Sequence, residues 1–116
     1  MTDTRGGSSG RARDVGGPAR HERPVLDGLG LDAARHADRL VLAATGAGVT
    51  RWATYLEPLP EHLRDDEPAA LRRTAMRARA AYGPKDSIRD ALPAELTEPF
   101  LEAVDRLLRE LNRSRG

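Results

Sequence analysis

A chain of 116 residues has room for one domain, and a formal net charge of +1 gives it no overall attraction to nucleic acid or to a membrane surface. It contains no cysteine, which excludes disulfides, thiolate metal sites and a thiol nucleophile. Leu, Ile, Val and Phe together fill only 22 of the 116 positions, so alanine has to complete the core. Because alanine buries little area, we expect a core that needs support from a second copy or another partner.

Arginine outnumbers lysine by 18 to 1, and this bias, with abundant Ala, Gly and Pro, is typical of a GC-rich, bacterial coding genome. The longest uncharged run, residues 40–50, is shorter than the ~20 apolar residues that cross a bilayer. The first residues lack the apolar stretch of a secretory signal. We therefore expect a cytoplasmic protein.

Residues 1–24 are predicted to form a disordered polar tail, and residues 25–116 an α-helical domain. The tail is rich in glycine and contains one aliphatic residue, Val15, so it cannot bury enough surface to offset the entropy of ordering. Its five arginines against three acids allow two interpretations, a solvated tail or a weak electrostatic arm for an acidic partner.

The first helix is predicted over residues 32–45, with Asp32 as its N-cap and glycines at its end. Leu42 lies off the apolar stripe of that helix, so it is either exposed or in contact with something else. A shorter helix is expected over residues 51–57, with Thr50 as its cap, and a helical turn is expected from Pro60 to Arg64.

The third helix, within residues 66–84, has the clearest limits in the chain. Asp66 suits the N-cap, and Pro68 suits the first turn, where its missing N–H costs nothing. Gly83 fits the left-handed position after a helix, and Pro84 prevents the helix from continuing.

A short helical piece is expected over residues 86–92, with Asp86 or Ser87 as its cap, and a last helix over residues 98–113, with Thr97 as its cap. The last helix has an apolar face nearly half a turn wide, so either two neighbouring helices cover it or part of it is an interface. No run of residues alternates with period two. The sequence therefore predicts an all-α fold: a small helical bundle of three main helices plus one or two short helices.

Four arginines and no acid lie in the middle of the third helix. On a helical wheel they form two margins around a narrow Leu/Ala/Tyr face, with Arg72 and Arg79 on one side and Arg73 and Arg77 on the other. In one interpretation their stems cover the core and their guanidinium groups pair with acids of neighbouring helices. In the other, the outer half of the helix, together with Lys85 beyond it, is an electropositive surface for an acidic protein or a phosphate backbone.

Trp52 and Tyr55 lie one turn apart on the short second helix. Aromatic residues at this spacing are usually part of a core, but Trp and Tyr are also frequent anchors of protein interfaces. Both residues are therefore candidates for partner binding.

No pattern in the chain predicts catalysis, a metal or a cofactor. The histidines, His21, His36 and His62, have no second histidine at the spacing of a zinc site. A helix-turn-helix that ends in residues 85–92 is disfavoured, because the recognition helix would be short and would carry two acids.

These observations favour a non-catalytic, regulatory helical module that binds another protein, with homodimerisation as a corollary of the wide apolar face. The alternative is a nucleic-acid-associated regulator that uses the arginine-rich third helix. No membrane partner is expected.

Overall fold

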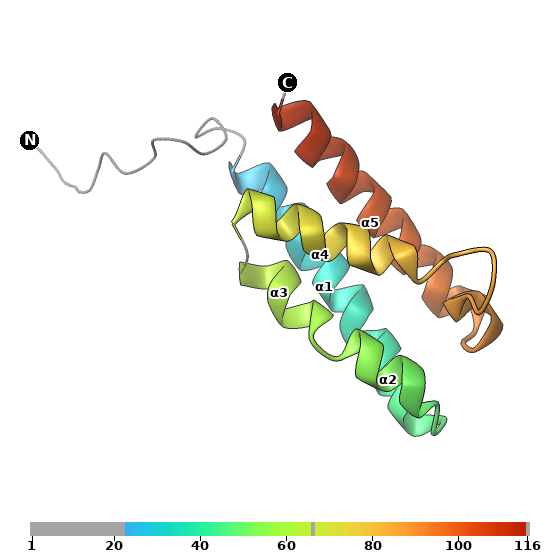
Figure 1. Cartoon of the computed structure of the whole chain (residues 1–116). Helices are drawn as coiled ribbons and strands as arrows, with labels where there is room; N and C mark the ends of the chain where they lie inside the picture. The colour runs from blue at the N-terminus through green and yellow to red at the C-terminus, as the bar shows by residue number, and fades with distance from the viewer. Residues whose placement is uncertain (1–22, 66, 116) are drawn as a thin grey trace, which may run out of the picture.

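The computed structural model describes residues 23–65 and 67–115, and every regular element in these ranges is helical (Figure 1). The elements in chain order are α1 (Arg23–Gly46), α2 (Thr50–Leu56), α3 (Leu59–Asp65), α4 (Pro68–Ala80), η3 (Ile88–Asp90) and α5 (Ala94–Arg115). Three long helices joined by short helical pieces confirm the predicted all-α bundle. The predicted tail falls outside the described residues, except for Arg23 and Pro24, which belong to α1.

Helix α1 is the central element of the bundle. It packs against α2, α3 and α5, whereas α4 packs against α3 and α5. In Figure 1, α2 and α3 fold back along α1, and α5 runs beside it. The wide apolar face of α5 is thus covered by two neighbours, α1 and α4, with Leu101 and Leu108 only partly buried at its margins. The first of the two alternatives for that face is the correct one.

Helix α1 begins nine residues earlier than the sequence predicts, and its first part contains Gly28 and Gly30. Glycine disfavours a helix by about 1 kcal/mol relative to alanine, which is why the pattern places the start at Asp32. Two tertiary contacts outweigh that cost. Leu26 is buried in the core, and Gly30 lies so close to α3 that a Cβ added there would be 2.6 Å from the Leu63 carbonyl oxygen.

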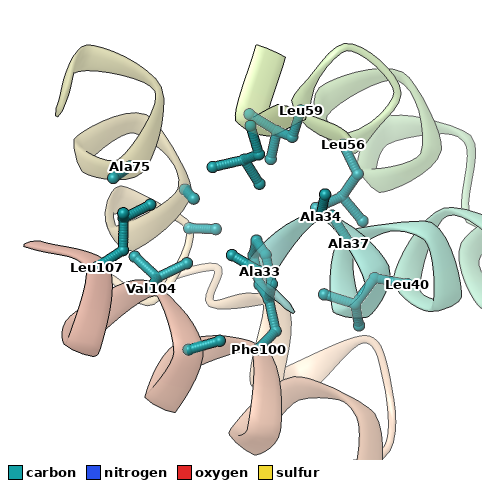
Figure 2. Close-up of a cluster of buried hydrophobic side chains, with 14 of the residues drawn as sticks. Ala33, Ala34, Ala37, Leu40, Leu56, Leu59, Ala75, Phe100, Val104 and Leu107 are labelled. Carbon is teal, nitrogen blue, oxygen red and sulfur yellow. The ribbon is translucent and has the colours of Figure 1, made fainter. Parts of the chain in front are cut away.

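The core combines buried alanines, from α1 and α4, with large side chains from α1, α2, α3 and α5 (Figure 2). Helix α1 contributes four buried alanines to it, and Phe100 of α5 points into the space beside Ala33 in Figure 2. Because alanine leaves room, the neighbouring helices can approach α1 closely and fill the core with their own side chains. The large, fully buried residues include Leu40, Leu56, Leu59, Phe100, Val104 and Leu107.

The predicted end of α4 is wrong in one respect. Gly83 does not adopt a left-handed conformation, and the positive φ in this turn belongs to Asp86, at 53°. Aspartate tolerates this region better than most residues, so the chain reverses there instead. Ser87 then caps η3 by accepting a hydrogen bond from the Arg89 amide, which confirms one of the two predicted caps, although the element is shorter than predicted.

Helix α5 begins at Ala94, four residues before the predicted start, so Thr97 is not its cap. Thr97 is fully buried, and Pro99 lies inside the helix. The pattern places a helix end before a proline, yet the Pro93 carbonyl accepts from the Leu96 and Thr97 amides and starts α5 upstream of Pro99. Tyr82 ties this first turn down by donating its hydroxyl hydrogen to the Thr97 carbonyl.

The remaining caps differ from prediction as well. Val49, not Thr50, precedes α2, and Glu67 occupies the position before α4; neither makes a side-chain cap hydrogen bond. Asp66, the predicted cap of α4, lies outside the described residues. The turn predicted at Pro60 is present as α3.

Candidate protein-binding surface

The four arginines of α4 separate into two pairs, as the helical wheel predicts. Arg72 donates to the Leu111 carbonyl oxygen at 2.8 Å and also to the side chain of Asn112, near the end of α5. Arg79 forms an ion pair with Asp105 at 3.0 Å. These two guanidinium groups attach α4 to α5. Their contacts are those of the first interpretation, in which the arginines pair with groups on neighbouring helices.

Arg77 faces α2 instead. Its guanidinium carbon lies 4.4 Å from the centre of the Tyr55 ring, within the range of a cation–π contact. The Tyr55 hydroxyl donates to the Arg77 carbonyl oxygen at 2.6 Å. That carbonyl is accessible because the Ala81 amide bonds to Ala78 in a tightened last turn. Tyr55 therefore holds both the backbone and the side chain of Arg77.

Trp52 completes this group from the core side. It is buried, and its ring meets the Tyr55 ring edge-on, with centroids 5.3 Å apart. The Arg51 guanidinium carbon lies over the Trp52 ring, 4.9 Å from the ring centre. The structure thus brings Trp52, Tyr55 and Arg77 together. Trp52 has little surface left for a partner, whereas Tyr55 is only half-buried.

A group of exposed residues on α4 forms a distinct surface, which we call the α4 outer face, with Arg77 at its edge beside α2. Met76 is the large apolar residue of this face and is 58 % exposed. Arg73 is exposed and makes no ion pair or hydrogen bond through its side chain within the described residues. The face carries no acid; its members are Ala69, Arg73, Met76, Arg77 and Ala80.

Lys85 is exposed in the turn after α4 and has no ion pair among the residues that the structure describes. Lys85 comes after Ala80, the last residue of α4. The electropositive surface predicted from Arg73 to Lys85 therefore extends past the end of the helix into a turn.

A second cluster, at the corner between α4 and α5, was not predicted. Arg89 makes a two-pronged ion pair with Glu98, at 2.8 and 2.9 Å, and its guanidinium lies 5.3 Å from the centre of the Tyr82 ring. Burial raises the pKa of the Tyr82 phenol, and the charge of Glu98 acts in the same direction. Tyr82 therefore stays a neutral donor to α5 near neutral pH, and the cluster is a structural clasp.

The Glu98 side of this clasp predicts a pH dependence. The hydrogen bonds from Arg89 lower the pKa of the Glu98 carboxyl below its ordinary value of about 4.3. The stabilisation is therefore complete above that ordinary pKa and is lost as the pH falls through the lowered, folded-state pKa. We expect Glu98→Gln to be less stable than the parent at pH 7 and the two denaturation midpoints to converge between pH 5 and 2, roughly the range over which such carboxylates titrate.

Urea denaturation followed by circular dichroism at several pH values measures this difference. The control is Glu95→Gln, which removes an exposed acid of the same helix that has no ion pair among the described residues. Midpoints of Glu95→Gln should run parallel to those of the parent. Parallel behaviour of Glu98→Gln would contradict the assigned role of the ion pair.

A shallow groove runs between α1 and the corner of α2 and α3. Its lining residues are Asp38, Val41, Leu42, Glu57, Pro60, Glu61 and Arg64. Leu42, which the sequence left unassigned, is 73 % exposed at its edge.

Within the described residues no group of three or more His, Asp or Glu converges in a way that could hold a metal ion. No helix in the same ranges is both long and apolar enough to cross a membrane.

Comparison of the chain with models of protein families, with curated proteins and with solved structures found no match.

Proposed function

We propose that this protein is a non-catalytic regulatory module that binds another protein through the α4 outer face. The observation that carries the proposal is the unequal use of the four α4 arginines. Arg72 and Arg79 are engaged by α5, whereas Arg73 and Arg77, which lie together on the other side of the exposed Met76, have no acidic partner among the described residues.

The chemistry of the face specifies the partner. Two guanidinium groups favour carboxylates, with which they make charge-assisted hydrogen bonds. The flexible Met76 side chain adapts to an apolar side chain of varied shape, and Ala69 and Ala80 allow a backbone to approach closely. An acidic amphipathic helix, with one or two apolar residues among its acids, fits these properties.

The contacts of Arg77 support the proposal further. Tyr55 restrains Arg77 through both its backbone and its side chain. Arg77 therefore loses less side-chain entropy on binding a partner than an unrestrained surface arginine would. Tyr55 is thus a supporting residue of the face, and Trp52 supports Tyr55 in turn.

The test is a double substitution, Arg73→Glu with Arg77→Glu, in an affinity capture from the native cell at several salt concentrations. We expect capture of the partner to fall at least tenfold, because the two repulsive charges replace two attractive ones. The matched control is Arg106→Glu with Arg109→Glu, which changes the net charge equally on the exposed side of α5. It should capture the partner as well as the parent does, and thermal melting should show that both variants fold.

Capture that survives the α4 double substitution would overturn the assignment of this face. The nucleic-acid alternative makes its own prediction: a mobility shift with duplex DNA at low salt, with log K falling by ~0.9 per phosphate contact as log salt rises. If the parent gives such a shift and the α4 double substitution abolishes it, the proposed partner is a nucleic acid and not a protein. The proposed location is the cytoplasm, which fractionation of the native cell would test.

A further inference from the structure

The side of α1 that points away from the bundle carries an ordered pattern of residues, which we call the α1 seam. Leu31 and Leu42 are 42 % and 73 % exposed, and Arg35 and Asp38 lie between them. The spacing of four, three and four residues places all of them on one line along the helix, the a and d spacing of a two-stranded coiled coil. The seam continues at both ends with exposed small or short residues, namely Pro24, Gly28 and Thr45.

The α1 seam is complementary to itself. If two copies pair their α1 helices antiparallel about a two-fold axis between residues 36 and 37, Leu31 of one copy meets Leu42 of the other. In the same register Arg35 meets Asp38. Each contact occurs twice, as a two-fold interface requires. Two leucines and two opposite charges that match in one register are the sign of an interface with a second copy, and not only of a solvated face.

The surroundings of Leu42 agree with this register. The groove beside α1 is lined by Val41, Leu42 and Pro60 together with four charged residues, and Asp38 and Leu42 belong both to the groove and to the α1 seam. Leu31 of the second copy would lie against the apolar part of this lining. Asp38 already accepts a hydrogen bond from Arg64 at 2.5 Å, and a carboxylate can accept from a second guanidinium. Among the described residues Arg35 makes one ion pair, a long contact of 3.9 Å to Asp32, so its guanidinium can turn to a second copy.

From this match we infer that the protein forms an antiparallel homodimer through the α1 seam, with Leu31 against Leu42 and Arg35 against Asp38. The occupant of this face is a second copy of the chain. A single helix from each copy buries less than the ~1,200 Å² at which stable complexes begin, so the dimer forms at high micromolar concentration. The inference does not rest on the α4 outer face, which lies on a different helix.

The register can be tested by disulfide trapping, because the natural chain has no cysteine. In the inferred dimer, residue 31 lies opposite residue 42 of the other copy, but two copies of residue 31 are ~16 Å apart along the helix, at 1.5 Å per residue. A disulfide needs Cα atoms closer than ~7 Å. An oxidised mixture of Leu31→Cys and Leu42→Cys chains should therefore give at least ten times more covalent dimer than either variant alone.

The control mixture contains Leu42→Cys and Met76→Cys chains. Met76 is the exposed apolar residue of α4, so this mixture should give no more covalent dimer than the single variants. Equal yields from all mixtures, or no covalent dimer at about 1 mM chain, a concentration above the high-micromolar range in which this small interface should associate, would overturn the inference.

Exchange of the charges at positions 35 and 38 provides an independent test of the inferred register. Arg35→Glu places two acids opposite each other, and Asp38→Arg places two arginines opposite each other, so each variant alone should sediment as a monomer. A mixture of the two restores both opposite pairs and should sediment as a dimer again. Because Arg35→Glu leaves the pair of Arg64 with Asp38 intact, its fold is undisturbed. Failure of the mixture to recover the dimer would contradict the inferred register.

Discussion

Replacement of Phe100 by alanine is expected to lower the free energy of unfolding by about 3–5 kcal/mol. Phe100 is the only phenylalanine of the chain and is fully buried. It fills the space left by the small residues of α1, including Ala33, and these cannot move inward to close a cavity because they have no side chain beyond Cβ (Figure 2). Since small domains have only about 5–15 kcal/mol of stability in total, much of it would be lost.

Chemical denaturation with and without the substitution measures this loss. Met76→Ala is the matched control, because it also shortens an apolar side chain but at a site that is 58 % exposed. We expect the control to change the free energy of unfolding by no more than about 0.5 kcal/mol. A loss below about 1 kcal/mol for Phe100→Ala would mean that Phe100 does not fill the core as described.

The second large effect is expected for Gly30→Ala. The new Cβ would lie 2.6 Å from the Leu63 carbonyl oxygen, closer than real Cβ atoms approach such an oxygen. The obstacle is backbone, not the end of a flexible side chain, so α3 as a whole has to move away from α1. Overpacking of this kind costs about 1–3 kcal/mol or more, which outweighs the ~1 kcal/mol that alanine gains over glycine in a helix.

Gly28→Ala separates these two contributions. Gly28 lies in the same helix, and an added Cβ there has nothing within 4 Å. Only the gain in helix propensity remains, so this variant should be more stable than the parent by about 0.5–1 kcal/mol. Opposite signs for the two variants in one set of melting curves support the close approach of α1 and α3. If both variants were stabilised, the two helices would lie further apart than the structure has them.

The fold class could be predicted because the apolar spacing of the later helices is clear. The predicted starts of α1 and α5 are wrong for a common reason. In both helices tertiary contacts outweigh a local residue preference against helix. Gly28 and Gly30 disfavour a helix on their own, yet burial of Leu26 and the approach of α3 keep α1 helical through them. Pro99 disfavours a helix interior in the same way, but α5 extends past it while Tyr82 holds its first turn.

The candidate surface was predictable in part. The helical wheel separates Arg72 and Arg79 from Arg73 and Arg77, and the structure keeps that separation. The wheel could not show that Tyr55, 22 residues away, would hold the Arg77 carbonyl, because that contact depends on how α2 packs on α4. The α1 seam was hidden for another reason: the sequence shows Leu42 off the apolar stripe, but only the packed bundle shows which face of α1 stays uncovered.

The clasp at the corner between α4 and α5 also bears on how the chain folds. Tyr82 meets Thr97 across 15 residues and Arg89 meets Glu98 across 9, whereas Arg72 reaches the end of α5 across 39. The entropy lost on closing a loop grows with its length, so these two corner contacts cost less to close than the contact of Arg72 with the end of α5. We therefore expect α4 and α5 to pair from the corner outwards, with the Arg72 contact formed last of the three.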